Sequence, residues 1–244
     1  MKTYMFASIC LLTFFSGFSQ LSVKNDYAII VKDEVLFVKD AVRLTDESST
    51  IYLRDEAQLV QGDGLSGNSG LGAVSVYQEG TVNQWVYNYW CAPVGSNNID
   101  NTINNDFFAN LIDDPLLGTG DTTDSNDALF TSSYNGSTDP LTISNRWLYT
   151  FEDYNNDQNL WWHFVGQADV IKPGLGFTMK GIGTAETGSQ TYDFRGKPNN
   201  GDLFNIVLDG QFTLIGNPYP SALDTRSFIH DDHNKNTING TLYF

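Results

Sequence analysis

The stretch Leu36-Phe37-Val38-Lys39-Asp40-Ala41-Val42-Arg43-Leu44 is followed, at a spacing of fifteen residues, by a similar stretch, Ile51-Tyr52-Leu53-Arg54-Asp55-Glu56-Ala57-Gln58-Leu59. Each copy has the pattern of a short strand, a charged corner and a second strand. Such a repeat is typical of the rungs of a small β-solenoid or of two successive hairpins, because one copy cannot bury its apolar face alone. Two copies are fewer than the three or more that stable repeat proteins need, so we expect them to pack on the chain that follows.

Beyond this repeat the sequence has the pattern of a β-sandwich. Short alternating apolar runs are bounded by Gly, Asn, Asp and Pro, and no stretch keeps the apolar spacing of an amphipathic helix over three turns. A short helix is expected over 106–112 with Asp106 as its N-cap, followed by a long exposed acidic loop over 113–127. The predicted strands are 85–92, 146–151, 160–165, 176–180, 191–194, 205–208, 212–215 and 240–244.

These patterns predict an all-β chain with two parts. Residues 20–80 form β-solenoid-like or hairpin repeats, and these pack on a jelly-roll-like β-sandwich over residues 81–244. The last predicted strand, 240–244, has no partner turn after it. We therefore expect the sandwich to be truncated at its C-terminus.

Residues 1–19 have the pattern of a secretory signal peptide. Lys2 supplies a positive start, residues 4–15 carry no charge, and small residues at Gly17 and Ser19 precede Gln20. The apolar stretch is too short for a stable membrane anchor, so no membrane span is predicted. We expect the mature chain to be found outside the cell or on its outer surface.

The charge of the chain bears on its partners. A formal net charge of −16 repels nucleic acid and anionic lipid headgroups, so nucleic-acid binding is excluded as a function. Without the predicted signal peptide one thiol remains, Cys91, and no intramolecular disulfide can form. Cys91 lies among aromatic residues, and we interpret it as a small buried hydrophobe rather than a nucleophile.

Two proline- and glycine-containing segments predict tight turns. Pro173 and Gly174 occupy the two central positions that a type II turn requires, and Gly176 then allows the next strand to start close to a neighbour. Pro218 and Pro220 remove two backbone donors, so the strand that starts at residue 212 must end before them.

Four motifs in one order carry a family resemblance. They are Tyr89-Trp90-Cys91-Ala92-Pro93-Val94-Gly95, Lys172-Pro173-Gly174-Leu175-Gly176-Phe177-Thr178-Met179-Lys180-Gly181, Tyr192-Asp193-Phe194-Arg195-Gly196-Lys197-Pro198-Asn199-Asn200-Gly201 and Leu214-Ile215-Gly216-Asn217-Pro218-Tyr219-Pro220-Ser221. The series resembles a module of large secreted or surface proteins of Bacteroidota, many of which end in a type IX secretion sorting domain. The resemblance covers residues 30–244 and implies location and architecture, since the family has no agreed activity. This sequence lacks a C-terminal sorting domain, so we expect a fragment or a truncated gene product.

The sequence contains few residues arranged for catalysis. No Gly-x-Ser-x-Gly and no His-Glu-x-x-His is present, and the 29 carboxylates include no pair that spacing singles out for glycoside hydrolysis. His230-Asp231-Asp232-His233 could place two imidazoles near two carboxylates, but the only other histidine is His163, which favours a solvated cluster over a metal site. We predict a non-catalytic protein.

A weak calcium site is the one cofactor that the sequence offers. Asp153, Asn155 and Asp157 place oxygen side chains at alternate positions, as calcium loops do, but the central Gly and the bidentate Glu are missing. A β-turn rich in Asn and Asp is the preferred interpretation. The further oxygen ligands that a real site would need could come from Asp113, Asp114, Asp121 and Asp124.

Trp161 and Trp162 are the candidate ligand-binding residues. Successive side chains of a strand face opposite ways, so we expect one ring in the core and one exposed, where it could stack on a sugar ring. The leading hypothesis is a non-catalytic structural or adhesion module of a larger secreted or surface protein. The alternative is a glycan-binding accessory module of a secreted polysaccharide-degrading enzyme, so the partners considered are an extracellular glycan and another surface protein.

Overall fold

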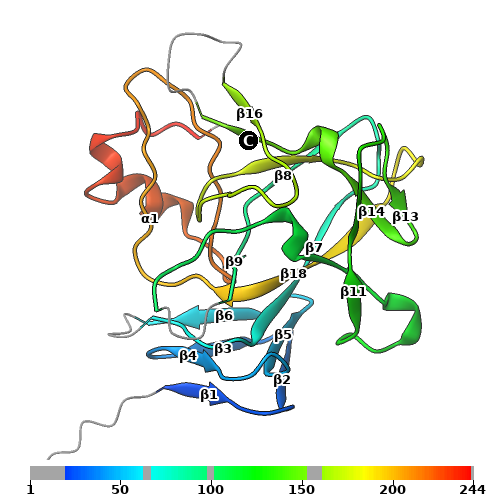
Figure 1. The fold of residues 1–244 in the computed structure, drawn as a ribbon. Coiled ribbons are helices and arrows are strands. Elements are labelled where there is room, and N and C mark those ends of the chain that lie inside the picture. The colour runs from blue at the N-terminus through cyan, green and yellow to red at the C-terminus, as the bar shows by residue number, and fades with distance from the viewer. Residues whose placement is uncertain (1–19, 63–66, 98–101, 153–160, 243–244) are drawn as a thin grey trace, which may run out of the picture.

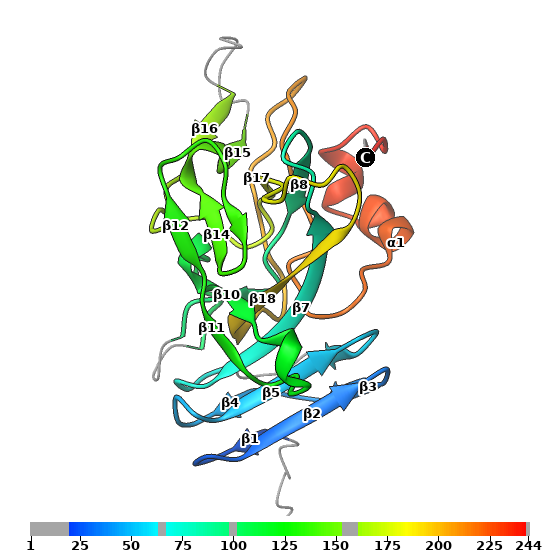
Figure 2. The same ribbon diagram turned by 90° about the vertical axis from the view of Figure 1, so that its right-hand side faces the viewer.

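The computed structural model describes residues 20–62, 67–97, 102–152 and 161–242, which form an all-β molecule (Figure 1). The described helices are the six-residue α1 (Thr225–His230) and short 3₁₀ helices. A stack of strands lies at the N-terminal end of the molecule, and a β-sandwich lies above it (Figures 1 and 2). The predicted all-β class is confirmed.

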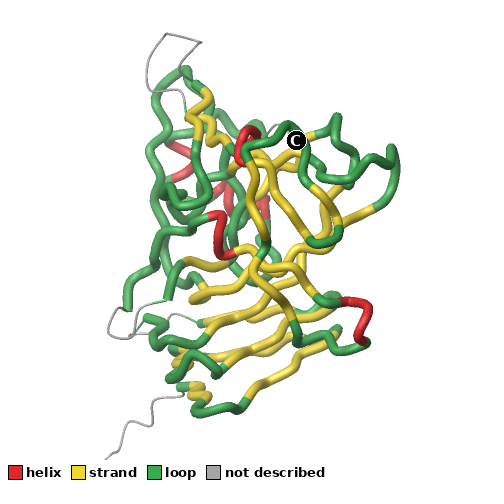
Figure 3. The backbone as a smooth tube through the Cα atoms, turned by 45° about the vertical axis from the view of Figure 1, so that its right-hand side comes forward, coloured by secondary structure: helices red, strands yellow, loops and turns green. Residues whose placement is uncertain are grey.

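The N-terminal part is a β-solenoid, and its strands lie one above another (Figure 3). Each rung contains three strands. Each strand of the first rung pairs in parallel with its counterpart in the second: β1 with β4, β2 with β5 and β3 with β6. The strands are β1 (Leu21–Val23), β2 (Ala28–Lys32), β3 (Val35–Val38), β4 (Val42–Leu44), β5 (Thr50–Arg54) and β6 (Gln58–Gln61). Of the two predicted alternatives, the solenoid is the one found, because these pairs are parallel and not hairpins.

The predicted spacing of fifteen residues is not the period of this solenoid. Leu36 pairs with Leu59 and Ile29 with Ile51, which places equivalent positions 23 and 22 residues apart (59 − 36 and 51 − 29). The shorter spacing matched the corner between β3 and β4 to the corner between β5 and β6. Both corners contain an aspartate, Asp40 or Asp55, and this local similarity concealed the third corner of each rung.

One continuous sheet joins the solenoid to the sandwich. β7 (Ala73–Thr81) pairs in parallel with β5 and antiparallel with β18 (Ser189–Pro198), the latter over eight residue pairs. Beyond β18 the sheet continues through β10 (Ile112–Pro115) and β11 (Ser125–Asp127), while β9 (Val94–Gly95) pairs with the end of β18. The expected packing of the repeat on later chain is therefore present as backbone pairing.

A second, antiparallel sheet completes the sandwich, in the order β16-β15-β17-β8. Its strands are β16 (Trp162–Phe164), β15 (Tyr149–Phe151), β17 (Phe177–Lys180) and β8 (Tyr87–Trp90). Aromatic rings fill the space between the two sheets: Phe107 stacks on Phe177 and on Phe194 at centroid distances of 5.7 Å, and Trp90 lies 5.6 Å from Tyr192. The predicted strands 85–92, 146–151, 160–165, 176–180 and 191–194 each overlap one of these strands or β18.

A small third sheet lies beside the sandwich. It has the order β12-β14-β13 and contains β12 (Leu129–Thr131), β13 (Ser137–Thr138) and β14 (Leu141–Ser144). Leu141 and Ile143 from β14 are fully buried, so this sheet closes one side of the same core.

The helix predicted over 106–112 is wrong. The chain forms only a 3₁₀ helix, η1 (Ala109–Leu111), whose N-cap residue is Phe108 with no side-chain cap, and then enters β10. Phe107, Ala109 and Ile112 are all buried, a spacing that one face of an α-helix cannot provide.

The acidic loop predicted over 113–127 is a β-hairpin. β10 and β11 pair antiparallel, with the 3₁₀ helix η2 (Leu117–Thr119) between them. Asp113 enters the sheet because its carboxylate lies 3.3 Å from Nε of Arg195 on the neighbouring β18. Of the acids that suggested a solvated loop, Asp113 lies within the sheet, whereas Asp121, Asp124 and Asp127 are exposed.

Three strands predicted near the C-terminus are not formed by the residues that the structure describes there. Residues 205–208 make no strand, and this segment is held through Asn205 Nδ2, which donates to the carbonyl of Pro173 at 2.9 Å. Residues 212–215 form only two isolated bridges, Thr213 with Glu152 and Ile215 with Leu175. Residues 240–242, the described part of 240–244, form no strand, and the backbone N–H of Thr241 donates to Asn239 Oδ1.

The turn predicted at residues 172–175 is confirmed. Gly174 has φ +85°, and the N–H of Leu175 donates to the carbonyl of Lys172 at 3.1 Å. Gly176 follows with its N–H bonded to the carbonyl of Leu214 at 2.8 Å, and a Cβ at Gly176 would lie 2.6 Å from Leu214 Cγ. This close approach brings the C-terminal segment against the start of β17.

Gly216 allows a second close approach, and its replacement should be costly. A Cβ at this position would lie 2.4 Å from Cβ of Cys91, so Gly216→Ala forces one of two packed segments to move. Overpacking of this kind costs about 1–3 kcal/mol, and we expect a thermal denaturation midpoint roughly 2–12 °C lower. Gly118→Ala is the matched control, since nothing lies within 4 Å of its added Cβ. Equal midpoints for the two variants would contradict the packing described.

Candidate functional site

The outward side of the four-stranded sheet carries a concentration of aromatic side chains. Trp90, Phe177 and Met179 are buried, so the alternate residues of β8 and β17 point away from the core. We call this surface the aromatic face. It consists of Tyr87, Tyr89, Trp147, Tyr149, Phe151, Trp162 and Phe164.

The register of the sheet aligns these side chains in rows. Tyr89 is paired with Thr178, Thr178 with Tyr149, and Tyr149 with Phe164, so one row crosses all four strands. The rings of Tyr149 and Phe164 meet edge to face at a centroid distance of 5.6 Å. In the next row Phe151 packs on Trp162 at 4.7 Å. The face is thus preorganised by ring-to-ring contact.

The aromatic face is open to solvent and slightly concave. Tyr89, Phe164 and Trp162 are 63%, 56% and 46% exposed, high values for side chains that soluble proteins usually cover. The concavity has a volume of about 340 Å³. Its lining consists of Tyr87, Tyr89, Trp147, Tyr149, Trp162 and Thr178. Desolvation raises the pKa of Tyr87, with Tyr149 and Tyr89 adding to the effect, so this hydroxyl keeps its proton and can donate.

Lys180 stabilises one edge of the aromatic face. Its Nζ lies 4.9 Å from the ring centroid of Trp147, and it donates to Asn135 Oδ1 at 2.8 Å and to the carbonyl of Tyr134 at 3.3 Å. Trp147 Nε1 donates to the same carbonyl at 2.7 Å. Desolvation lowers the pKa of Lys180. Because the ammonium group is engaged by these acceptors and rings, it fixes the orientation of Trp147.

The structure places the two predicted tryptophans differently from each other. Trp162 opens β16 and lies on the aromatic face, as the exposed member of the pair. Trp161 is not the core ring that alternation predicted: it precedes the strand and is only partly buried, with its ring 5.9 Å from that of Phe151. Strand alternation does not apply to a residue outside the strand.

The predicted calcium residues cannot be placed. Asp153, Asn155 and Asp157 lie outside the described residues. Among the residues that are described, no group of three or more His, Cys, Asp or Glu side chains could hold a metal ion. Two of the acids proposed as further ligands are engaged elsewhere, because Asp113 pairs with Arg195 and Asp114 Oδ2 accepts from the backbone of Leu141 at 2.9 Å.

The histidine cluster near the C-terminus has a local role. Asp231 Oδ1 accepts from the backbone of His233 at 2.9 Å and of Asn234 at 3.3 Å, and Asp232 pairs with Lys235. These contacts shape the turn that follows α1.

Cys91 is poorly suited to nucleophilic chemistry. Desolvation raises the pKa of its thiol to about 12, so the reactive thiolate is scarce at neutral pH. The sulfur also lies beneath Gly216, which the close approach of the two segments requires. Both observations support the interpretation of Cys91 as a packing residue.

A second polar cluster lies where the solenoid meets the sandwich. We call Arg54, Ser75, Asp113, Asp193 and Arg195 the junction network. Asp193 is fully buried; it accepts from Ser75 Oγ at 2.5 Å and from Arg195 Nε at 2.7 Å. Ser75 Oγ in turn accepts from Arg54 at 2.8 Å, so a hydroxyl relays the contact between a guanidinium and a carboxylate that are 4.0 Å apart. The network ties β5, β7, β18 and β10 together.

Sequence reasoning missed most of the aromatic face. Only Trp162 was predicted, because it stood next to a second tryptophan. A signal was present in three short patterns with an aromatic residue at every second position: Tyr87-x-Tyr89, Tyr149-x-Phe151 and Trp162-x-Phe164. Each pattern alone describes an ordinary half-buried strand, and only their adjacency in one sheet makes a site.

Comparison with known proteins gives one match to a family model, over part of the chain, and no activity. Residues 128–244 match the model of a family described as a domain of unknown function (DUF8693). The matched region contains β18 but not its main partner β7, so it shares its sheet with the rest of the chain. No curated protein and no solved structure matches the chain. None of the described helices is long and apolar enough to cross a membrane.

Proposed function

We propose that this chain is a non-catalytic extracellular module that binds glycans through the aromatic face. The observation that carries the proposal is the gathering of exposed Tyr89, Trp162 and Phe164 on one side of one sheet. The C–H faces of sugar rings bury well against aromatic rings, while tyrosine and threonine hydroxyls can bond to the sugar hydroxyls. A shallow face also suits a ligand that lies along a surface.

The exported location rests on the sequence. Residues 1–19 have the pattern of a signal peptide but lie outside the described residues, and the four-motif series resembles secreted or surface modules of Bacteroidota. A glycan outside the cell is the partner that such a location makes available. It is also compatible with the acidic surface, which disfavours nucleic acid.

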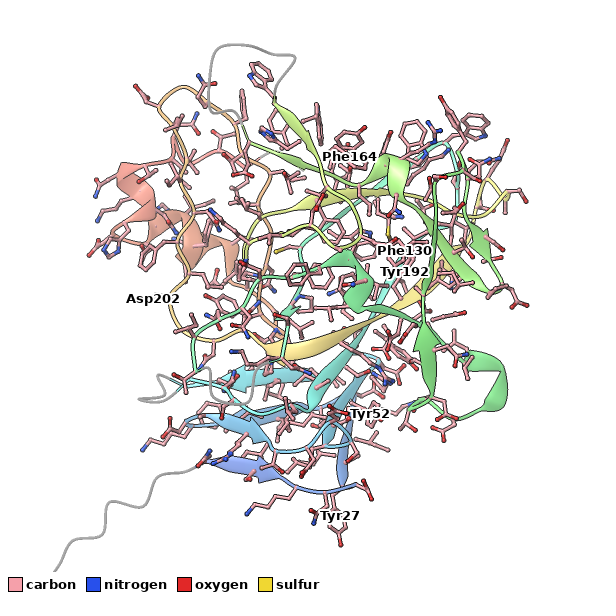
Figure 4. The ribbon with its side chains drawn as sticks, viewed as in Figure 1. Tyr27, Tyr52, Phe130, Phe164, Tyr192 and Asp202 are labelled. Carbon is pink, nitrogen blue, oxygen red and sulfur yellow. The ribbon has the colours of Figure 1, made fainter. Side chains whose placement is uncertain are left out.

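A second candidate function is structural or adhesive contact with another surface protein. It is favoured by the first rung of the solenoid, where Tyr27, Ile30, Val35 and Phe37 are exposed. Tyr27 lies at the end of the molecule opposite Phe164 (Figure 4), so this surface is separate from the aromatic face. A protein partner on the solenoid would leave the glycan proposal unaffected.

Replacing Trp162 with alanine should weaken glycan binding. Burial of an aromatic side chain against a ligand contributes about 1.5–3 kcal/mol, so we expect the affinity for a glycan found on an array to fall roughly tenfold to a hundredfold. Isothermal titration calorimetry with the purified glycan measures the loss. The circular dichroism spectrum should stay unchanged, because Trp162 is on the surface.

Phe204→Ala is the matched control for this prediction. Phe204 is also strongly exposed, but its ring lies 6.2 Å from that of His233 and not on the aromatic face. Its replacement should leave glycan affinity within twofold of wild type. Equal losses for both variants, or binding that survives Trp162→Ala intact, would rule out the aromatic face as the binding surface.

A further inference from the structure

A second concavity lies beside the aromatic face, between the solenoid and the sandwich. It has a volume of about 450 Å³ and is bounded by β6, β7, β8 and the segment that follows Gly216. Small-molecule sites typically fall between about 300 and 1,000 Å³. We call it the junction groove. Its lining includes Gln58, Gln78, Tyr89, Asn217, Tyr219 and Ser221.

The junction groove and the aromatic face meet at Tyr89. This side chain is strongly exposed and lines both concavities. β8 is the edge strand of the four-stranded sheet, so the aromatic face ends at β8 and the groove begins on its other side. A ligand that stacks on Tyr89 is therefore in position to enter the groove.

The side chains that line the two concavities are uncharged. Neither concavity is lined by any Lys, Arg, Asp or Glu, although the chain as a whole contains 13 basic and 29 acidic residues. Anionic ligands are normally bound through Arg or Lys, which are absent from these linings. The polar groups that remain are amides and hydroxyls, beside aromatic and aliphatic side chains, and such a lining suits a neutral polyol.

Two glutamine side chains of the groove have hydrogen-bonding capacity. Within the described part of the chain the Gln78 amide forms no hydrogen bond, although the residue is half-buried. Gln58 Oε1 accepts from the backbone of Ala222 at 2.8 Å, which holds the side chain in place and leaves its amide N–H groups to donate. Asn217, by contrast, is occupied on both sides, because it bonds to Ser221 and Tyr219.

We propose that the aromatic face and the junction groove form one continuous site for an uncharged oligosaccharide chain. One part of the chain stacks on Trp162 and Tyr89, and the next part lies in the groove, where Gln78 and Gln58 bond to its hydroxyls. This inference rests on the proposed glycan-binding function and specifies its ligand: a neutral chain of several sugars, not a single sugar and not a uronate or sulfated polymer.

The test compares short and long neutral probes. Each neutral disaccharide and the matching hexasaccharide are titrated into the whole chain by calorimetry. The pairs are cellobiose and cellohexaose, xylobiose and xylohexaose, and mannobiose and mannohexaose. Polygalacturonate serves as the anionic probe. We expect at least one hexasaccharide to bind ten times more tightly than its disaccharide, and polygalacturonate not to bind.

Gln78→Ala separates the groove from the aromatic face. Loss of one or two hydrogen bonds should weaken the hexasaccharide roughly three- to tenfold and leave the disaccharide unchanged, whereas Trp162→Ala should weaken both. Glu79→Ala is the matched control, because Glu79 is exposed and its side chain points to the other side of β7. It should change neither affinity.

Each other outcome overturns a defined claim. The continuous site would be rejected if a disaccharide and its hexasaccharide bound with equal affinity and Gln78→Ala changed neither affinity. That result would leave binding at the aromatic face intact. Binding of polygalacturonate in preference to the neutral probes would reject the uncharged ligand. Failure of every neutral probe and of polygalacturonate to bind would reject this inference together with the proposed function.

Discussion

Replacing Asp193 with alanine is expected to lower the free energy of unfolding by about 3–5 kcal/mol, because it leaves a buried cation without its partner. The Asp193 carboxylate is fully buried and accepts hydrogen bonds from Ser75, Ser125 and Arg195. Arg54, itself 3% exposed, would retain its charge with only neutral acceptors around it. The lost interactions connect the solenoid to the sandwich, so both parts should lose stability together.

Urea unfolding followed by tryptophan fluorescence measures this effect. A loss of that size also lowers the midpoint of thermal denaturation by roughly 6–20 °C for a chain of this length. Asp26→Ala, which removes an exposed carboxylate from the solenoid, is the control and should change stability by less than about 0.5 kcal/mol. A loss below about 1 kcal/mol for Asp193→Ala would mean that solvent compensates the guanidinium groups.

The parts of the fold that the sequence predicted are those that local chemistry determines. The Lys172–Leu175 turn follows from Pro173 and Gly174 alone, and the strand over 176–180 follows from alternation beside it. In both cases the deciding residues are neighbours in the chain.

The solenoid period was not predictable in the same way. Parallel strands are joined by long connections, so no single turn fixes their register as a hairpin turn does. The sequence offered similar corners at Asp40 and Asp55, and alignment of these corners gave fifteen residues. The pairing of Leu36 with Leu59 instead requires all three corners of a rung to be counted.

The candidate site depends on strand order, which the sequence does not contain. β8 and β15 are separated by more than fifty residues, yet both flank β17 in the sheet, and this brings Tyr89 and Tyr149 into one row. The junction network arises in the same way, since Asp193 meets Ser75 only because β18 pairs with β7. From sequence alone, Asp193 was one acid among 29.

The second large effect expected is a pH dependence caused by Asp113. Burial raises the pKa of this carboxyl to about 7, against the opposing influence of Arg195 and with Asp193 and Asp127 adding to the rise. In the unfolded chain an aspartate has a pKa of about 3.9. The folded state therefore binds the proton more tightly, and stability that is present at low pH is lost as the pH rises from about 4 to about 7.

The comparison of wild type with Asp113→Asn isolates this effect. A shift of about three pKa units corresponds to at most roughly 4 kcal/mol, and the variant, which cannot ionise, should gain about 2–4 kcal/mol relative to wild type between pH 4.5 and 7.5. Glu152, whose pKa burial also raises, acts in the same direction but equally in both proteins. Lys197, with its pKa lowered by desolvation to about 8, acts mainly above this range.

Urea unfolding at four pH values across the range provides the measurement, with Asp124→Asn, an exposed acid of the same hairpin, as the control that should follow wild type. Parallel stability curves for wild type and Asp113→Asn would show that Arg195 keeps the carboxyl ionised throughout. A widening gap in favour of the variant would show that desolvation outweighs the ion pair. The same result would mean that Asp113 is protonated at mildly acidic pH, within the sheet that joins the solenoid to the sandwich. The connection between these two parts is then most stable where the carboxyl is neutral.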